Sequence, residues 1–540
     1  MSILSKLFVR KDKTFNKQKN EKQIYQNLKK SFSKNGTLFY AGELLKIACE
    51  EFENNIFLFT ENKNITFKEL YFRSIQLSEK FKKFGVKKRD KVLIYCNNSV
   101  EFYVSYFAAW QIGAVCVPLN IFLHEKEIAY VFNDCKPKLI FSSSHLKHNL
   151  INIKNFGLDS GERIILTEED IDWEFEVPEK IEQVYPNFNI ERLDEDELCL
   201  LLYTSGTTGN PKGVMLSSKN VLTNAIQDYT RLQTIRELKK RERFFAVLPL
   251  FHVFAQNTCI WCPVLTGGSV VIVSKIDRKL IVKGLRKNPT IFLGFPALYG
   301  LLCLIKTAPL DSIKLFISGA DALPDKIRMG FSSIYGRKIC AGYGLTEAAP
   351  VVALNEINDE QPTDVVGFPF VDIECDIRDF QGKSLGVGKT GNLWLKGDNI
   401  MLGYYNSPDV TSKVLQDGWL NTGDLGRIYK DGRIAITGRS KDLIIHKGFN
   451  IYPQEIENIL MSHPAVFKAA VLGIEEDSSG QVPVAYVAVK DKKEIEKYLR
   501  DLCSQNLASY KIPRKFICLD DLPMNATGKV DKKQLKVINN

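Results

Sequence analysis

The chain has 540 residues, 45% of them hydrophobic and 25% charged, with a net charge of +10. This length exceeds what one hydrophobic core usually supports, so we expect a large domain and a smaller one, in a composition typical of soluble globular proteins. The apolar start of the chain is too short and too interrupted by lysine for a secretory signal peptide. The 12 cysteines are scattered among apolar neighbours, which favours a reducing, cytoplasmic location without disulfide bonds.

The positive charge is concentrated at the N-terminus. Residues 1–36 hold ten Lys and Arg residues against Asp12 and Glu21, so only two of the ten net positive charges belong to the rest of the chain. The body therefore has no general affinity for nucleic acid. We expect residues 1–36 to form a basic tail that rests on anionic membrane, at the inner surface of the cell membrane. A solubilising tail and a targeting segment are the alternatives.

The first half of the chain alternates between helical and strand patterns. A helical pattern at residues 44–52 precedes a strand at Ile56–Thr60, and an amphipathic helix is predicted at Ile65–Phe84. Further short strands rich in Val, Ile and Leu are predicted at Lys91–Tyr95, Ala114–Leu119, Leu139–Phe141, Arg163–Leu166 and Leu198–Tyr203. This order indicates an α/β fold with a parallel sheet flanked by helices.

Residues 244–274 contain no charged side chain, which raises the alternative of a transmembrane segment. Pro249, Pro263 and the pair Gly267-Gly268 divide the run into lengths that suit a buried β-α-β passage, which we favour. From Val365 to Arg439 short strands alternate with Gly, Asp and Asn turns, which indicates a small β-rich subdomain. After Lys441 a compact α/β domain is predicted, with helices at Pro453–Ser462 and Lys493–Leu507 and strands at Ala465–Gly473 and Val482–Val489.

The segment Tyr203–Lys212 has the composition of a phosphate-binding loop. It reads Tyr-Thr-Ser-Gly-Thr-Thr-Gly-Asn-Pro-Lys and follows the predicted strand that ends at Tyr203. Glycines let the backbone approach a polyanion, while peptide N–H groups, hydroxyls and a lysine donate hydrogen bonds. It is not a Walker A loop, because the Gly-Lys-[Ser/Thr] ending is absent. A flexible surface turn is the alternative.

Two other motifs do not indicate sites. Residues 386–391 match a dinucleotide fingerprint, but a strand rather than the required helix is predicted after them, so we expect a β-turn. Cys259 and Cys262 form a single Cys-x-x-Cys pair inside an apolar run, and we expect them to pack in the core.

Five motifs together resemble the adenylate-forming superfamily, which includes acyl-CoA synthetases, peptide-synthetase adenylation domains and beetle luciferases. They are the loop above and the segments 342–347 (Gly-Tyr-Gly-Leu-Thr-Glu), 422–424 (Thr-Gly-Asp), 438–442 (Gly-Arg-Ser-Lys-Asp) and 528–529 (Gly-Lys). The resemblance covers residues 40–535 and is greatest to medium- and long-chain fatty acyl-CoA synthetases. It implies an AMP-binding N-terminal domain at 37–440 and a mobile C-terminal lid domain at 441–540.

The resemblance also implies which residues bind ATP. In such enzymes a carboxylate attacks the α-phosphate of ATP, so the site must supply donors and Mg²⁺ for the developing charge. The residues expected to hold the nucleotide phosphates are Thr204, Ser205, Gly206, Thr207, Thr208, Gly209 and Lys212. Glu347 is expected to coordinate Mg²⁺ and Thr346 to reach the α-phosphate. The residues expected around adenosine are Gly319, Ala320, Tyr343, Asp424 and Arg439, with Asp424 accepting from the ribose hydroxyls. Residues 319 and 320 are expected to line the acyl site as well, and a core role is the alternative for Tyr343.

The lid domain is expected to serve both half-reactions. By resemblance, Lys529 neutralises the carboxylate and α-phosphate as they meet, and Lys441 is the hinge about which the lid rotates. The rotation would present a second face, including Lys447 and Gly448, where coenzyme A attacks the adenylate. A solvent-facing charge is the alternative for Lys529.

The acid is expected to be hydrophobic. The segment 248–255 resembles that of fatty acyl-CoA synthetases, which places His252 at the acyl-site entrance, although a core histidine is the alternative. Gly294 is expected to leave room for chain methylenes. The implied activity is fatty acid–CoA ligation with ATP, Mg²⁺ and CoA. The alternatives are a ligase that charges an acyl carrier protein, an aryl acid–CoA ligase and a catalytically silent binding paralogue. Chain length and oligomeric state stay open.

Overall fold

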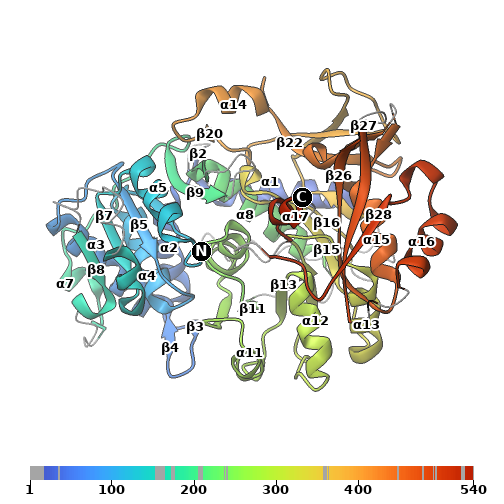
Figure 1. Cartoon of the computed structure of the whole chain (residues 1–540). Coiled ribbons are helices and arrows are strands. Elements are labelled where there is room, and N and C mark those ends of the chain that lie inside the picture. The colour runs from blue at the N-terminus through green and yellow to red at the C-terminus, as the bar shows by residue number, and fades with distance from the viewer. Residues whose placement is uncertain are drawn as a thin grey trace.

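The computed structural model describes residues 17–34, 37–151, 164–171, 177–204, 211–235, 238, 241–356, 362, 364–446, 449–476, 480–490, 492, 495–524 and 530–538. Two large sheets form the main body, and a third, smaller sheet belongs to the C-terminal domain (Figure 1). The predicted α/β class with a large N-terminal part and a smaller C-terminal domain is therefore confirmed.

The first sheet has the strand order β20-β10-β9-β6-β5-β7-β8. Its strands are β5 (Lys91–Tyr95), β6 (Val115–Pro118), β7 (Leu139–Ser142), β8 (Ile164–Thr167), β9 (Leu198–Thr204), β10 (Lys212–Ser217) and β20 (Gly403–Tyr404). Strands β5 to β9 are parallel, whereas β10 runs antiparallel to β9. The helices that follow these strands in the chain are α4 (Val100–Gln111), α5 (Glu125–Cys135), α6 (Lys147–Ile151), α7 (Ile181–Val184) and α8 (Ser218–Gln233). The predicted alternation of strand and helix is confirmed.

The second sheet joins a parallel half to an antiparallel half. The parallel half contains β3 (Ile56–Phe59), β11 (Arg243–Ala246), β12 (Ser269–Ile272), β13 (Ile291–Gly294), β14 (Leu315–Ser318) and β15 (Cys340–Gly344), with β4 (Asn64–Thr66) at its edge. The antiparallel half contains β16 (Val351–Leu354), β17 (Val365–Pro369), β18 (Glu374–Arg378), β19 (Thr390–Lys396), β21 (Leu415–Gln416), β22 (Trp419–Ile428) and β23 (Ile434–Arg439). This half is the predicted β-rich subdomain. Strand β19 begins at Thr390, within the motif 386–391, so a strand and not a helix comes next, as the β-turn interpretation requires.

Helices cover and separate the sheets. They are α2 (Leu44–Phe52), α3 (Phe67–Lys83), α9 (Val253–Gln256), α10 (Cys262–Thr266), α11 (Arg278–Leu285), α12 (Pro296–Ile305), α13 (Asp325–Tyr335) and α14 (Pro408–Val414). Strands β11 and β12 enclose α9, the π-helical turn η6 (Asn257–Trp261) and α10, so the buried β-α-β prediction for residues 244–274 is confirmed. Cys259 and Cys262 are buried there, in the main core. No described helix is both long and apolar enough to cross a membrane.

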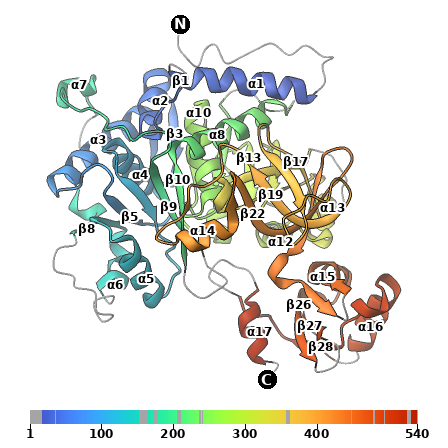
Figure 2. The ribbon, with the colours of Figure 1, turned by 90° about the horizontal axis from the view of Figure 1, so that it is seen from above.

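The C-terminal domain has its own sheet and cores. Its elements are β24 (Ile444–His446), β25 (Phe449–Ile451), α15 (Pro453–Ser462), β26 (Val466–Glu476), β27 (Gly480–Val489), α16 (Ile495–Asn506), β28 (Lys515–Leu519) and α17 (Lys532–Ile538). Figure 2 shows this group set apart from the main body. Two buried apolar clusters lie within it. The predicted helix at 453–462 is confirmed with the same bounds.

The prediction that residues 1–36 form a tail is wrong for residues 17–34, which pack on the body. Helix α1 (Lys17–Ser31) lies beside α8 on the body (Figure 2), and Tyr25, Leu28 and Phe32 are buried in the main core. Glu21 forms a buried ion pair with Arg231 of α8 at 2.6 Å. Positions 21, 25, 28 and 32 share one helical face, which the charge count concealed. Because this face packs on protein, it is not available to lipid, and the expected membrane association is not supported. Residues 1–16 lie outside the described residues.

Candidate active site

Three parallel strands bring predicted site residues to one edge of the second sheet. Strands β13, β14 and β15 are parallel neighbours, so their carboxyl ends meet at the same edge. Gly294 ends β13, Gly319 and Ala320 follow β14, and Thr346 and Glu347 follow β15 in the 3₁₀ turn η7 (Thr346–Ala348). The peptide N–H of Gly319 donates to the carbonyl of Gly294 at 3.1 Å. This edge is where open α/β sheets bind ligands.

Backbone geometry at this edge accounts for the small residues in the motifs. A Cβ at Gly344 would lie 2.2 Å from the carbonyl oxygen of Pro350, so only glycine allows the chain to turn here. Ala320 has φ of +67°, which is the left-handed region that residues with a side chain seldom adopt. Strained backbone of this kind gathers at functional sites, in agreement with the predicted adenine-binding role of residues 319 and 320.

The predicted phosphate loop connects two antiparallel strands. Thr204 ends β9 and Lys212 begins β10, and the two residues are direct cross-strand partners. The loop therefore leaves and re-enters the sheet at one point. The predicted phosphate ligands Ser205, Gly206, Thr207, Thr208 and Gly209 lie outside the described residues.

Tyr404 joins the predicted metal ligand to the predicted phosphate-binding lysine. Its hydroxyl donates to Oε1 of Glu347 at 2.8 Å, and Nζ of Lys212 lies 5.2 Å from the centroid of its ring. Burial and then the charge of Glu347 raise the pKa of Tyr404, so the hydroxyl stays a donor at neutral pH. The backbone carbonyl of Glu347 accepts from the N–H of Met401 at 2.9 Å. Tyr404 is a site residue that the motif analysis did not include.

The chemistry of Glu347 fits Mg²⁺. Its carboxylate is partly exposed, offers the hard oxygen donors that this cation prefers, and has one oxygen oriented by Tyr404. The described residues contain no cluster of three or more potential metal ligands. A single carboxylate is nevertheless sufficient, since Mg²⁺ in such sites takes its other ligands from substrate phosphates and water.

Asp424 is held by two other predicted nucleotide-binding residues. Tyr343, on β15, donates its hydroxyl to Oδ2 at 2.5 Å, and Nε of Arg439 lies 2.8 Å from Oδ1. Asp424 and Arg439 are cross-strand partners on β22 and β23. Burial and the charge of Asp424 raise the pKa of Tyr343. For Arg439, burial lowers the pKa, but the neighbouring negative charges, Asp424 first, outweigh burial and raise the pKa of the guanidinium. The triad thus presents an oriented carboxyl group whose oxygens accept hydrogen bonds.

Gly294 lies at the predicted edge, but its missing side chain faces another direction than expected. A Cβ there would approach Tyr299 Cε2 to 3.0 Å and Leu298 Cδ2 to 3.2 Å, both in a buried cluster. The glycine thus makes room for α12 to pack on β13. Its expected role of leaving room for the methylenes of a substrate stays a prediction.

His252 precedes α9 and packs against one aromatic ring. The exposed imidazole lies 4.8 Å from the ring of Phe251, which in turn packs against the exposed ring of Phe122 at 6.0 Å. Phe254, two residues further on, covers Gly319, since a Cβ at that glycine would lie 3.2 Å from its ring. The segment after β11 thus connects an exposed aromatic group to the predicted adenine-binding edge. His252 is not a core histidine.

Of the predicted hinge and lid residues, the structure describes Lys441. Lys441 lies in the 3₁₀ turn η8 (Ser440–Asp442), and burial, together with nearby Arg439, Lys532 and Lys533, lowers its pKa against the effect of Asp442. Lys532 pairs with Asp442, the residue after Lys441, at 3.3 Å within the predicted lid domain. Lys447, Gly448 and Lys529 lie outside the described residues.

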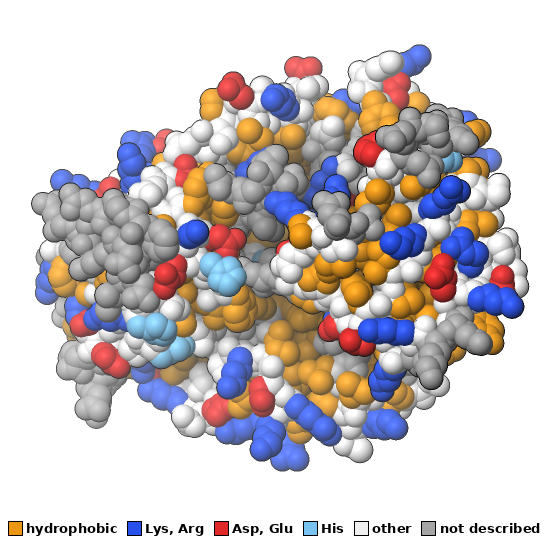
Figure 3. Space-filling view, in the orientation of Figure 1, with side chains coloured by type: hydrophobic (Ala, Val, Ile, Leu, Met, Phe, Trp, Pro, Cys, Tyr) orange, Lys and Arg blue, Asp and Glu red, His pale blue; other side chains and the backbone are white. Residues whose placement is uncertain are grey.

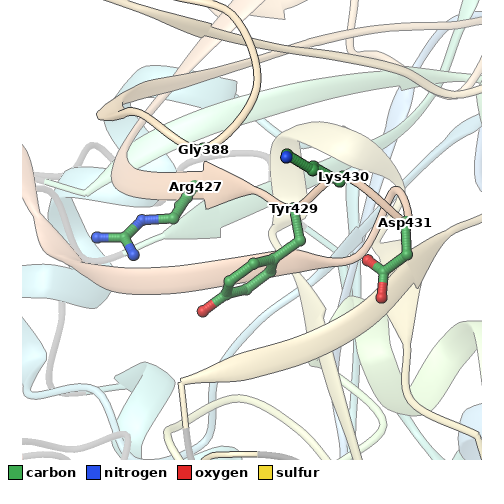
Figure 4. A pocket seen from close by; sticks show the side chains of 5 residues that line it. All are labelled: Gly388, Arg427, Tyr429, Lys430 and Asp431. Atoms are coloured by element: carbon green, nitrogen blue, oxygen red, sulfur yellow. The ribbon is translucent and has the colours of Figure 1, made fainter.

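The surface shows two hollows of different character. A hollow near the middle of the face in Figure 3 is bordered below by hydrophobic side chains. A separate cavity of about 440 Å³ is lined by Gly388, Arg427, Tyr429, Lys430 and Asp431 at the far end of β22 (Figure 4). Arg427 there donates to the hydroxyl of Thr390 at 3.0 Å. None of the predicted site residues lines this second cavity.

The fold and site are those of an AMP-forming acid–thiol ligase. Known proteins of similar sequence and structure agree. The long-chain-fatty-acid–CoA ligase of Bacillus subtilis (strain 168) is 29% identical over 512 residues, covering 88% of this chain and 90% of that protein. The anthranilate CoA ligase AuaEII, solved with anthranoyl-AMP, superposes with a TM-score of 0.83 at 26% identity, covering 93% and 97% of the two chains. The o-succinylbenzoate CoA synthetase of Bacillus subtilis, solved with ATP and magnesium, gives 0.81 at 28% identity, covering 92% and 99%.

The pattern of the AMP-binding enzyme family matches residues 45–405, and that of the AMP-binding enzyme C-terminal domain matches residues 455–529. The chain belongs to the AMP-binding enzyme family. The predicted resemblance is confirmed, and ATP, Mg²⁺ and CoA are the nucleotide, metal and co-substrate of this class.

Proposed function

We propose that the protein activates a fatty acid as its acyl-adenylate and transfers the acyl group to coenzyme A. The observation that carries this proposal is the segment 244–274, which contains no Asp, Glu, Lys or Arg. It begins within β11 and continues past the end of that strand, where it supplies Phe251, His252 and Phe254. No charged side chain from this segment could pair with a second charge on the acid. Similarity to the long-chain-fatty-acid–CoA ligase of Bacillus subtilis supports the same substrate class.

In the first step a carboxylate oxygen of the acid bonds to the α-phosphorus of ATP, and the bond to the β-phosphate oxygen breaks. Pyrophosphate leaves with that electron pair, and no proton is needed. Lys212, with Thr204 and the loop between them, would hold the β- and γ-phosphates, and Lys529 would meet the α-phosphate. Mg²⁺ held through Glu347 supplies positive charge to the phosphate oxygens.

The nucleoside would be held by Asp424. Its carboxylate, fixed by Tyr343 and Arg439, would accept hydrogen bonds from the ribose hydroxyls, while residues 319 and 320 would line the adenine. In the second step the CoA sulfur bonds to the acyl carbon, its proton passes to solvent, and AMP leaves with the electrons of the acyl–oxygen bond. Residues 447 and 448 would lie on the lid face that admits CoA after rotation about Lys441.

An aryl acid is the second candidate substrate. The aromatic group of Phe122, Phe251 and His252 could stack on a flat ring, since ring pairs prefer such contacts. The similar structure of an anthranilate CoA ligase supports this candidate at a comparable level of identity.

A panel of carboxylic acids distinguishes the two. The panel contains saturated acids of 6 to 18 carbons, 4-coumarate, benzoate and anthranilate, each assayed for pyrophosphate release with and without CoA. Each buried methylene contributes ~0.8 kcal/mol, so kcat/KM for a fatty acid ligase should rise about fourfold per carbon up to an optimum. A higher kcat/KM for the aryl acids than for every fatty acid would refute the fatty acid proposal.

A further inference from the structure

Helix α8 carries a buried stripe of polar side chains. Asn220, Asn224, Gln227 and Arg231 follow the spacing of one helical face, and all four are buried. Each donates to backbone carbonyls of other segments: Asn220 to Asp398 and Ile400, Gln227 to Val371, and Arg231 to Leu354 and Pro369. The helix thus holds several segments of the antiparallel half in place.

Asn224 differs from the others because it joins two segments of the site to each other. Its Nδ2 donates to the carbonyl of Val351 at 2.7 Å, and its Oδ1 accepts from the N–H of the same residue at 3.0 Å. The same Oδ1 accepts from Nδ2 of Asn257 at 2.6 Å. Asn224 and Asn257 are both fully buried, so these bonds have no competition from water.

The two segments serve the two substrates of the proposed reaction. Val351 begins β16, four residues after Glu347, and the N–H of Leu345 donates to the carbonyl of Pro350. Asn257 follows Phe254 by three residues, and Phe254 covers Gly319. A displacement of the Phe254 segment therefore reaches Asn257 and, through the shared Oδ1, the backbone that carries Glu347.

The segment around Asn257 has two features that suit a segment able to adopt a second backbone conformation. It forms a π-helical turn between two α-helical pieces, a geometry that is frequent at functional sites. Nε2 of Gln256 and Oδ1 of Asn257 are buried without a hydrogen-bond partner among the described residues. These two polar atoms can form new hydrogen bonds when the π-helical turn shifts.

We propose that Asn224 is a positioning residue that couples binding of the acid to binding of Mg²⁺-ATP. The inference rests on the proposed placement of the acid against residues 252–261. Acid binding moves the π-helical turn, and the Asn257–Asn224–Val351 chain of hydrogen bonds sets the position of Glu347. By linkage, the nucleotide raises the affinity for the acid by the same factor as the acid raises that for the nucleotide.

Binding without turnover measures this coupling. The dissociation constant of dodecanoate is determined by calorimetry with and without saturating Mg²⁺ and α,β-methylene-ATP. In the wild-type protein we expect the nucleotide to tighten dodecanoate binding at least about fivefold, which is the lower end of typical coupling. In Asn257→Ala and Asn224→Ala the ratio should fall to within about twofold of unity, while dodecanoate alone binds within about threefold of wild type.

Thr230→Val is the matched control. Thr230 is buried on the same helix, and its hydroxyl donates to the carbonyl of Ile226 within α8 at 2.7 Å. This variant should keep the wild-type ratio. A wild-type ratio in Asn257→Ala, or the same loss of ratio in Thr230→Val, would overturn the coupling role. If dodecanoate does not bind the wild-type protein at all, the fatty acid proposal fails and takes this inference with it.

Discussion

Tyr404 shows how one side chain can organise a site that charged residues dominate. Its hydroxyl orients Glu347, and its ring lies beneath the ammonium group of Lys212. A hydrogen bond to a charged group contributes roughly 1.5–3 kcal/mol. The motif analysis missed it because residue 404 lies 57 positions from Glu347 and no motif includes it. A glycine at the adjacent position 403, where the structure has φ of +140°, is the local sequence feature that marks this site.

We predict that Tyr404→Phe weakens the response to Mg²⁺. The ring, and with it the contact to Lys212, is retained, but Glu347 loses its donor. The Mg²⁺ concentration for half-maximal pyrophosphate release should rise about tenfold, with kcat at saturating Mg²⁺ reduced less. The same substitution at the next residue, Tyr405→Phe, serves as the control. Equal Mg²⁺ dependence of the two variants would contradict the role given to Tyr404.

Asp228 predicts a pH dependence of stability. Burial raises its pKa to about 7 from the ordinary 3.8, although Arg231 acts in the opposite direction. A carboxyl with a raised pKa in the folded state stabilises the fold most below its unfolded pKa and loses that contribution as the pH rises towards about 7. Asp228→Asn should therefore raise the free energy of unfolding, measured by urea denaturation, by up to ~4 kcal/mol at pH 8 and by less at pH 5. A gain that is equal at both pH values would contradict the assignment.

At the scale of elements, local patterns predicted the alternating strands and helices because each element has its own apolar period. Helix α15 is confirmed with the bounds that its sequence predicted. Helix α1 was missed because its apolar face, Tyr25, Leu28 and Phe32, has few members among ten basic residues. The direction of Gly294 could not be predicted, since it depends on how α12 packs on β13.

The position of α1 gives a prediction opposite to that of a dispensable tail. Leu28→Ala removes a buried side chain and should lower the free energy of unfolding by about 2–4 kcal/mol. Gln26→Ala, on the exposed face of the same helix, should change it by less than about 0.5 kcal/mol. Thermal unfolding followed by circular dichroism compares them. Equal midpoints for the two variants would mean that α1 does not contribute to the fold.

At the scale of the whole molecule, polar contacts join the body to the lid domain among the described residues. Nζ of Lys326 on α13 donates to the carbonyl of Pro464 at 2.9 Å and approaches that of Val466 at 3.3 Å. Within the lid domain, Lys532 pairs with Asp442 beside the predicted hinge. Polar contacts such as those of Lys326 are typical of interfaces between domains that move relative to one another. The sequence predicted the boundary from motifs, but these contacts depend on the packing of two separate folds.

The two half-reactions should therefore separate by mutation. Lys529→Ala should lower acyl-adenylate formation by ~10²–10³ while sparing thioester formation from supplied acyl-adenylate. Lys441→Pro should do the reverse, because proline fixes φ and prevents the rotation at residue 441. Each variant's unaffected half-reaction is the control for its folding. Equal loss in both half-reactions would refute the assigned role of the residue concerned.

The central claim is that a fatty acid passes through an acyl-adenylate to a CoA thioester on this protein. A single turnover with ATP, Mg²⁺ and dodecanoate, quenched in acid and analysed by mass spectrometry, tests it most directly. Without CoA, dodecanoyl-AMP should accumulate to about one equivalent per active site, and adding CoA should convert it to dodecanoyl-CoA and AMP. Formation of ADP and phosphate would contradict this mechanism. So would a CoA thioester that forms after CoA is added, if no adenylate was detectable before the addition.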